Sequence, residues 1–348
     1  MALPTIITTV PTSVPVGDIE VNPITNRVYF VNPNTTAGTV GVLSTLTNRI
    51  IATIQVGRFP LKLAINPRTN RVYVTNFRDG TVSVISGRTN RVIKTLQVGR
   101  NPDSVNVNVR TNLIYVSSAS GIVTVIDGKS NCIRTTILIG GRPSAIVINK
   151  RTNRIYVTNT INNSVSAING STQTVIATIK VGNNPVITPA LNPITNRIYV
   201  ANNLSRFLSV INGRTNKLLK NVQLGRLQSE VILNPLTNRI YVSSAQQVKK
   251  GKLFVLNGNN NKVIATRVLS SSSSTFINPI TNHLFVSNFN KNRMSVYNAS
   301  TFKRIAVFPC VTGVNITLNP LTNRLYVAND NSITVIQDGP RLTHRFKL

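Results

Sequence analysis

Arginine is the residue type whose number and spacing in this chain could support a chemical function. The 348 residues include 39 Lys and Arg against 8 Asp and Glu, which gives a formal net charge of +31. A guanidinium group presents several N–H donors in a planar fork, so clustered arginines suit phosphate, sulfate and carboxylate groups. The arginines that we expect to bind a polyanion all lie beside a Thr-Asn pair, and they are Arg27, Arg68, Arg71, Arg88, Arg91, Arg110, Arg151, Arg154, Arg197, Arg214, Arg239 and Arg324.

Side chains that support other kinds of chemistry are scarce. Neither His283 nor His344 is expected to act as a general base. Cys132 and Cys310 form neither a disulfide framework nor a zinc-binding set. The sequence also lacks the glycine-rich motifs that hold phosphate groups in nucleotide-binding enzymes. We therefore expect no catalytic residues and no cofactor, and we predict that the chain is not an enzyme.

The elements that position the arginines follow from an internal repeat. A unit of the form Asn-Pro-x-Thr-Asn-Arg-hydrophobic-Tyr-Val-x-Asn recurs through almost the whole chain at intervals of 41 to 44 residues. The repeated Asn of its Thr-Asn pair stands at Asn26, Asn70, Asn112, Asn153, Asn196, Asn238, Asn282 and Asn323. Because the copies leave no room for a second domain, we expect residues 1–348 to form a single domain.

Each unit contains four short segments with the composition of β-strands. In the second unit these are Lys62–Asn66, Arg71–Asn76, Gly80–Ser86 and Arg91–Val98. They are rich in Val, Ile, Thr and Tyr, and turn-forming Asn, Gly, Pro or Asp residues separate them. Four antiparallel strands per unit, repeated around an axis, are typical of an all-β fold, the β-propeller.

The repeated motifs resemble the YVTN family of β-propeller repeats. The resemblance is clearest at Arg154–Asn159, Ser166–Gly170 and Val175–Ile179, and it extends over essentially the entire chain. It implies an interaction role and favours an extracytoplasmic or surface location, and some similar propellers are thought to bind DNA. The chain departs from the family pattern at Leu113, Ser117, Ser118, Ser243, Ser244, His283 and Phe285.

The ends of the repeat predict how the ring closes. Residues Ile6–Val10 align without a gap to Ile50–Ile54, the fourth strand of the first unit. We therefore expect eight blades, the last of which takes its fourth strand from the N-terminus, a velcro closure. The tail Thr343–Leu348 is the competing fourth strand, and seven blades with a spare motif are the alternative architecture.

Propeller geometry divides the loops between two faces. If the four strands of a unit are labelled a to d outwards from the axis, the a–b and c–d turns share one face. These turns carry twenty basic residues and two acidic ones, Asp127 and Asp338. The loops of the opposite face carry eleven basic and four acidic residues. We therefore expect the first face to be strongly cationic.

Aromatic side chains suggest a second, smaller site on the opposite face. The tyrosines of strand b lie in mid-strand and are expected in the core. Phe59 beside Arg58 and Phe77 beside Arg78 lie in two loops of the same unit, where they could meet and stack a base or a sugar. Packing of the loops at the blade rim is the favoured alternative interpretation.

Three carboxylates, Asp18, Glu20 and Glu230, occur on the innermost strands, where a cation could bind. Asp18 and Glu230 occupy equivalent repeat positions, and Lys62 occupies that position in the second unit and could neutralise them. Because three carboxylates around a ring are sparse for an oxygen-ligand site, we expect no metal.

The sequence thus predicts a non-catalytic binding platform whose cationic face binds a polyanion, either nucleic acid or an acidic glycan or cell-surface polymer. The alternative is a structural, coat or surface protein that assembles with a layer of acidic protein partners. A third hypothesis, an enzyme similar to lactonase or dehydrogenase-like propellers, would need a bound metal.

The compartment is left open by the sequence. No stretch approaches the roughly 20 apolar residues of a membrane helix, so we do not expect an integral membrane protein. The start of the chain lacks the basic segment of a secretory signal, which favours the cytoplasm, whereas the family resemblance favours an extracellular or surface location. Oligomeric state is not predicted.

Overall fold

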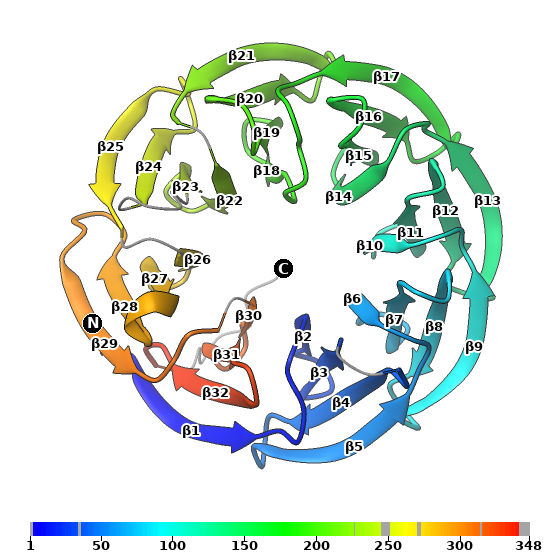
Figure 1. Ribbon diagram of the computed structural model, residues 1–348, viewed down its shortest axis with the longest axis horizontal. Coiled ribbons are helices and arrows are strands. Elements are labelled where there is room, and N and C mark those ends of the chain that lie inside the picture. Colours follow the sequence, from blue (N-terminus) through cyan, green and yellow to red (C-terminus); the bar gives the residue numbers. More distant parts are fainter. Residues whose placement is uncertain are drawn as a thin grey trace.

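The chain folds into a ring of eight four-stranded antiparallel sheets, seen in a computed structural model (Figure 1). The structure describes residues 3–33, 36–225, 227–244, 251–269, 273–313 and 315–340. In every sheet strand a lies nearest the axis and strand d forms the rim (Figure 1). The all-β propeller fold with eight blades is therefore confirmed, and the seven-bladed alternative is wrong.

The blades are numbered in chain order, and the strands of each are given from the axis outwards. Blade one holds β2 (Ile19–Asn22), β3 (Arg27–Asn32), β4 (Thr39–Ser44) and β5 (Arg49–Gln55). Blade two holds β6 (Pro60–Asn66), β7 (Arg71–Asn76), β8 (Thr81–Ser86) and β9 (Arg91–Gln97). Blade three holds β10 (Pro102–Asn108), β11 (Leu113–Ser118), β12 (Ile122–Asp127) and β13 (Cys132–Leu138). Blade four holds β14 (Pro143–Asn149), β15 (Arg154–Asn159), β16 (Ser164–Asn169) and β17 (Thr174–Lys180).

The second half of the ring follows the same order. Blade five holds β18 (Ala190–Asn192), β19 (Arg197–Ala201), β20 (Phe207–Asn212) and β21 (Lys217–Gln223). Blade six holds β22 (Gln228–Asn234), β23 (Arg239–Ser244), β24 (Lys252–Asn257) and β25 (Val263–Val268). Blade seven holds β26 (Ser273–Asn278), β27 (His283–Asn288), β28 (Arg293–Asn298) and β29 (Arg304–Pro309), with a 3₁₀ turn, η1 (Phe289–Lys291), between β27 and β28. Blade eight holds β30 (Asn315–Asn319), β31 (Arg324–Ala328), β32 (Ser332–Gln337) and β1 (Thr5–Pro11).

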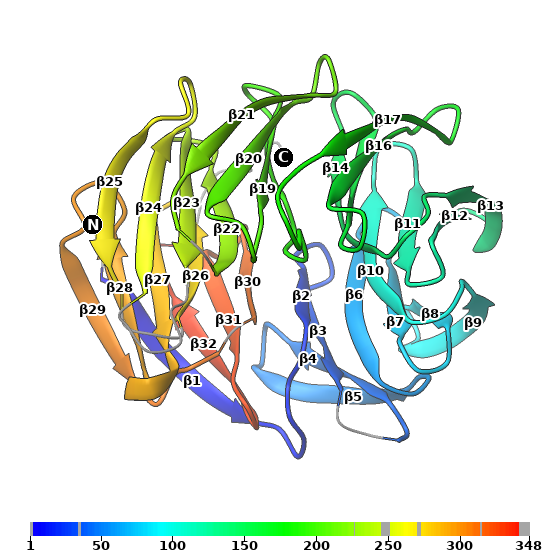
Figure 2. The same ribbon diagram turned by 45° about the horizontal axis from the view of Figure 1, so that its top comes forward.

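The ring closes through the N-terminal strand, as predicted. Strand β1 pairs antiparallel with β32, from Thr5 opposite Gln337 to Pro11 opposite Ser332. Figures 1 and 2 both show β1 in dark blue beside the red β32. The competing strand, Thr343–Leu348, lies outside the described residues. Pairing β1 with β32 covers an edge that would otherwise be open to another chain.

The core lies between neighbouring blades, because strands b and c are covered on both sides. One cluster joins Tyr73 and Val84 of blade two to Val105 and Val116 of blade three. The strand-b tyrosines are fully buried, which confirms their predicted place in the core: Tyr29, Tyr73, Tyr115, Tyr156, Tyr199, Tyr241 and Tyr326. Among the described residues, no helix has the length and apolar character needed to cross a membrane.

A ladder of asparagines holds the a–b turns of successive blades in register. The last Asn of strand a donates its side-chain amide to the Thr-Asn asparagine of the next blade, as in the 2.6 Å bond from Asn66 Nδ2 to Asn112 Oδ1. The accepting asparagine has positive φ, 58° at Asn112, a conformation that Asn tolerates well. The same bond joins Asn22 to Asn70, Asn108 to Asn153, Asn149 to Asn196, Asn192 to Asn238, Asn234 to Asn282, and Asn278 to Asn323. These bonds fix the turns that carry the arginines.

Candidate functional site

The a–b and c–d turns form one face of the ring, which we call the turn face. Arg27 at the start of β3 donates Nη1 to Asn90 Oδ1 in the β8–β9 turn, at 3.0 Å. Tyr73 of β7 likewise donates its hydroxyl to Asn131 Oδ1 in the β12–β13 turn, at 3.0 Å. The beginning of strand b in one blade is therefore joined to the c–d turn of the next blade.

The arginines at the start of strand b are half-buried, and several of them link neighbouring blades. Arg197 Nη1 donates to the carbonyl oxygens of Gly258 and Asn259 at 2.7 and 2.6 Å. Arg239 and Arg324 make similar bonds to the next blade, at 3.3 and 3.1 Å. Some N–H groups of these arginines therefore donate to acceptors within the protein. The half-buried set is Arg27, Arg71, Arg154, Arg197, Arg239 and Arg324.

The other arginines predicted to bind a polyanion are exposed. They are Arg68, Arg88, Arg91, Arg110, Arg151 and Arg214. Within the part of the chain that the structure describes, ion pairs join Arg58 to Asp79, Lys62 to Asp18 and His283 to Asp338, so none neutralises an exposed arginine of this set. Arg110 Nη1 donates to the Arg151 carbonyl at 3.1 Å. The exposed guanidinium groups are thus available to an external anion.

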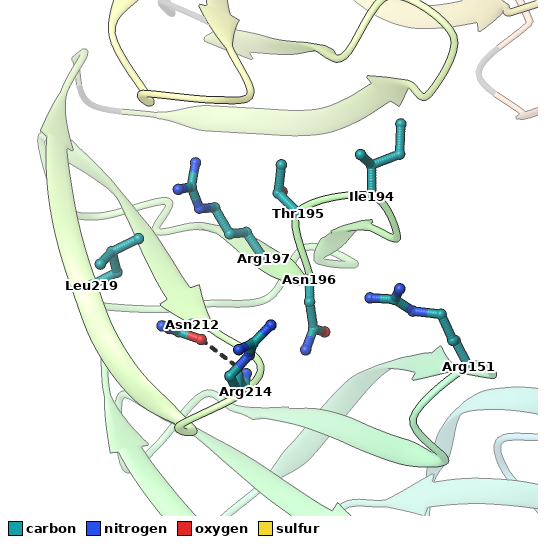
Figure 3. Close-up of a pocket in the computed structure, with 8 residues that line it drawn as sticks. All are labelled: Arg151, Ile194, Thr195, Asn196, Arg197, Asn212, Arg214 and Leu219. Atoms are coloured by element: carbon teal, nitrogen blue, oxygen red, sulfur yellow. Dashed lines mark hydrogen bonds between the residues drawn. The ribbon is translucent and has the colours of Figure 1, made fainter.

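A pocket of about 370 Å³ between blades four and five brings together two exposed arginines and one half-buried arginine (Figure 3). Arg151 comes from the β14–β15 turn, Arg197 from the start of β19 and Arg214 from the β20–β21 turn. Figure 3 shows Arg151 and Arg214 on opposite sides of Asn196, whereas the Arg197 guanidinium points towards the next blade. The other lining residues are Ile194, Thr195, Asn196, Asn212 and Leu219, which include no carboxylate.

Local hydrogen bonds hold the turns that present the pocket arginines. Asn149 Oδ1 accepts from the backbone N–H groups of Arg151 and Thr152 at 3.1 and 3.2 Å. Asn212 Oδ1 accepts from the Arg214 N–H at 2.9 Å. Side-chain acceptors of this kind stabilise tight turns. Both guanidinium groups therefore extend from a well-ordered backbone, which reduces the entropic cost of binding.

The aromatic cluster predicted on the opposite face forms. The rings of Phe59 and Phe77 lie with centroids 5.9 Å apart, and Arg78 Cζ lies 5.6 Å from the Phe59 centroid. Both rings are half-buried. Arg58 Nε pairs with Asp79 Oδ1 at 2.6 Å, and a hydrogen bond from the Arg58 backbone is the main reason why the pKa of Asp79 is lowered. The cluster lies in the β5–β6 and β7–β8 loops of the face opposite the turn face, and Asp79 partly neutralises the charge of Arg58.

Two of the three innermost carboxylates, Asp18 and Glu230, are hydrogen-bonded within the ring, whereas burial raises the pKa of the third, Glu20, to about 8. Asp18 accepts from Lys62 Nζ at 2.8 Å and from the Leu63 backbone N–H at 3.0 Å. Glu230 accepts from the backbone N–H of Thr275 at 2.5 Å and from the Thr275 hydroxyl at 2.7 Å. Thr275 occupies the repeat position of Leu63. Each of these two carboxylates thereby joins its own strand a to the next one. The described residues contain no group of three or more His, Cys, Asp or Glu side chains that could hold a metal.

The blade-linking arginines were not distinguished from the exposed ones by sequence reasoning. All twelve were treated as equal anion binders, because each lies beside a Thr-Asn pair. A signal was present in the position of each arginine in its a–b turn, because those that follow the Thr-Asn pair begin strand b and are half-buried, whereas those that precede it, such as Arg68 and Arg110, are exposed. A Cβ at Gly258 would meet Asn238 Oδ1 at 2.0 Å, so the turn requires glycine there. Its carbonyl then accepts from Arg197.

Comparison with known proteins supports the fold. No protein-family model matches the sequence, so membership of the YVTN family is not shown, and no curated protein matches it either. Among solved structures, the chain is similar to the dihydro-heme d1 dehydrogenase NirN in complex with DHE, at 12% identity and a TM-score of 0.74. That match covers 85% of this chain and 66% of the dehydrogenase chain. It is also similar to hydrazine synthase of Kuenenia stuttgartiensis, at 17% identity and a TM-score of 0.64, over 81% of this chain and 96% of that chain.

These similarities contradict the prediction that the chain is not an enzyme. Both similar structures belong to proteins that are named as enzymes, so this fold occurs in enzymes. The prediction rested on the scarcity of histidines and clustered carboxylates. That argument fails because a bound cofactor can supply the reactive group. At identities of 12% and 17% the similarity shows the fold alone and assigns no reaction to this chain.

Proposed function

We propose that the chain is a binding platform whose turn face binds a polyanion, such as nucleic acid or an acidic surface polymer. The observation that carries the proposal is the pocket formed by Arg151, Arg197 and Arg214, whose lining includes no carboxylate. The exposed guanidinium groups of Arg151 and Arg214 border this space and suit phosphate or sulfate groups, whereas the Arg197 guanidinium is bonded to blade six. The eightfold repeat with its Arg-Ile-Tyr-Val-Thr-Asn motif further supports placing the chain among YVTN-type propellers.

The surroundings of the pocket support an extended anion over a single small one. Arg68 and Arg88 of blade two and Arg110 of blade three are exposed on the same face, so basic groups continue along several blades. A polymer with regularly spaced phosphates or sulfates can contact several of these groups at once. Each neutralised phosphate of duplex DNA would release counterions and steepen the salt dependence of binding.

The test is fluorescence anisotropy of the wild-type protein with duplex DNA, single-stranded DNA and a sulfated glycan over a range of salt concentrations. We expect binding that weakens steeply with salt. A variant with Arg68→Ser, Arg151→Ser and Arg214→Ser should bind about tenfold or more weakly and show a salt slope that is shallower by about two to three.

The matched control removes exposed basic residues from the opposite face. Arg100→Ser, Arg142→Ser and Arg206→Ser change the net charge by the same amount, and all three residues are exposed. If both variants lose affinity equally, the binding reflects only net charge and the turn face is not the site. If wild-type protein binds none of the three polymers near physiological salt, the proposal is wrong.

Assembly with an acidic protein layer is the second candidate. It is favoured by exposed aliphatic side chains on the outermost strands, such as Ile51 at 47%, Ile93 at 46% and Ile176 at 41% exposure. These strands also have one unpaired edge each, which can pair with another chain. Sedimentation at moderate salt distinguishes the candidates, because an ordered oligomer would favour assembly and a monomer that binds polyanions would favour the platform.

A further inference from the structure

The residues at the tips of the a–b turns, which immediately precede the Thr-Asn pairs, fall into two groups of consecutive blades. We call these groups the arginine arc and the aliphatic arc. The residue that precedes Thr-Asn stands at an equivalent position in every blade, so the eight tips lie on one circle around the axis. In three consecutive blades, two to four, this residue is an exposed arginine: Arg68, Arg110 and Arg151. In the remaining blades it is aliphatic: Ile194, Leu236, Ile280, Leu321 and Ile24.

Most of the aliphatic tips are strongly exposed. The side chains of Ile24, Leu236 and Ile194 are 66%, 70% and 60% exposed, and Leu321 is 42% exposed. Leu46, at the tip of the c–d turn of blade one, is 74% exposed on the same face. Exposed aliphatic residues that are concentrated on one face are typical of a surface that binds another protein or a membrane.

Basic residues also stand at the c–d tips of two blades of the arginine arc and of blade five, which follows it. The residue equivalent to Leu46 is Arg88 in blade two, Lys129 in blade three and Arg214 in blade five, all exposed. The a–b tips of the turn face therefore form a cationic sector over blades two to four and an aliphatic sector that runs from blade five through blade eight to blade one. Exposed basic residues of the c–d turns also lie beside the aliphatic tips, and they are Arg49, Lys262, Lys303 and Arg304. Both sectors lie on the same face of the ring.

We propose that the turn face docks on an anionic lipid bilayer, with the arginine arc on the headgroups and the aliphatic tips inserted among them. This inference rests on the proposed function, in that it names the source of the anion. Membrane-surface binding combines buried apolar side chains with attraction to anionic lipids. Nucleic acid would not explain the tips, because bases stack on aromatic groups and all of these tips are aliphatic.

The experiment measures co-sedimentation of the full chain with vesicles of phosphatidylcholine alone and with vesicles that also contain phosphatidylserine. Wild-type protein should bind the anionic vesicles and leave the neutral ones largely unbound. A variant with Ile24→Ser, Leu236→Ser and Leu321→Ser should lose about tenfold or more in partitioning, because three apolar side chains no longer enter the interface. Its circular dichroism spectrum and melting temperature should match those of wild type.

The matched control changes exposed aliphatic residues of the opposite face. Ile161, Val186 and Leu204 are 67%, 41% and 57% exposed, and they lie in loops between strands b and c or between blades. Replacing all three with Ser should leave vesicle binding within about twofold of wild type, because such surface substitutions do not touch the docking face.

Binding to duplex DNA separates this inference from the proposed function. The aliphatic-tip variant should bind DNA as tightly as wild type, whereas Arg68→Ser with Arg110→Ser and Arg151→Ser should weaken binding to both DNA and vesicles. Unchanged vesicle binding by the aliphatic-tip variant overturns the inference and leaves the polyanion proposal standing. DNA binding without any vesicle binding also overturns it and makes nucleic acid the partner. Wild-type protein that binds neither vesicles nor any of the three polymers overturns both proposals.

Discussion

The imidazole Nδ1 of His283 lies 2.6 Å from Oδ1 of Asp338, and both side chains are buried. His283 stands where most blades have the arginine that begins strand b, and Asp338 stands where blade two has Gly87. Asp338 Oδ2 also accepts from Asn278 Nδ2 and from the Thr281 hydroxyl, each at 2.6 Å. A side-chain pair thus replaces the arginine-to-carbonyl link at the junction of blades seven and eight.

Substitution of Asp338 should destabilise the protein. Asp338→Gly removes the acceptor of three buried donors, which should lower the free energy of unfolding by about 3 kcal/mol or more. Adding His283→Arg should recover part of the loss, because an arginine there could donate to the carbonyl of residue 338 as Arg197 does to Gly258. Urea denaturation of both single variants and the double variant measures the coupling. Strictly additive losses would show that the two positions do not act as a pair.

Arg197 and Arg214 line the same pocket but should respond differently to substitution. Arg197→Ala removes bonds to two carbonyl oxygens of blade six, so it should cost about 1–2 kcal/mol of stability. Arg214→Ser should change stability by less than about 0.5 kcal/mol, because its exposed side chain contacts no described residue through a hydrogen bond or ion pair. Arg214→Ser should instead weaken polyanion binding. Chemical denaturation and anisotropy on the same samples test both, and a stability loss for Arg214→Ser equal to that for Arg197→Ala would contradict the distinction.

The fold could be predicted because the turns and strands of each repeat are determined by residues within that repeat. Asn70 supplies the positive φ of its turn, 49°, and Tyr73 follows at the position that is buried in the strand. Local turn chemistry and strand patterning agree in nearly every unit. A unit that departs from the pattern can therefore still be assigned by comparison with the others. The N-terminal closure was predictable for the same reason, since Ile6–Val10 matches the fourth strand of another unit.

The candidate site was less predictable because its geometry depends on contacts between units. Whether an arginine such as Arg197 links blades or faces solvent is decided by the c–d turn of the next unit, where Gly258 lies 61 positions further along the chain. The two arcs of turn tips were also missed, because each tip is an ordinary turn residue when its unit is considered alone. Only the ring brings Arg151 beside Ile194 and Arg214 in one pocket.

Stability should depend on pH through Glu230. Burial raises the pKa of Glu230 to about 7, although hydrogen bonds from Thr275 and Ser274 oppose the shift. Between about pH 4.5 and pH 7 the folded protein holds a proton at Glu230 that the unfolded chain releases. The contribution of Glu230 is therefore fully present below about pH 4.5, is lost as the pH rises towards 7, and is constant above that.

Comparison with Glu230→Gln isolates this contribution. The amide cannot ionise but can still accept from Thr275, so the unfolding free energy of the variant should fall less than that of wild type across this pH range. Urea titrations at several pH values between about 4.5 and 8 provide the measurement. Parallel pH profiles for the two proteins would show that Glu230 does not titrate differently in the folded and unfolded states.

Removal of the N-terminal strand should open the ring. Strand β1 supplies the fourth strand of blade eight, and its Val10 is buried against the core that blades eight and one share. Deleting residues 1–12 should expose the outer edge of β32, lower the melting temperature by several degrees and promote aggregation. A synthetic peptide of residues 3–12 should restore the melting temperature, whereas a peptide of the same composition in scrambled order should not. A truncated protein that melts like wild type would mean that β1 contributes little to closure.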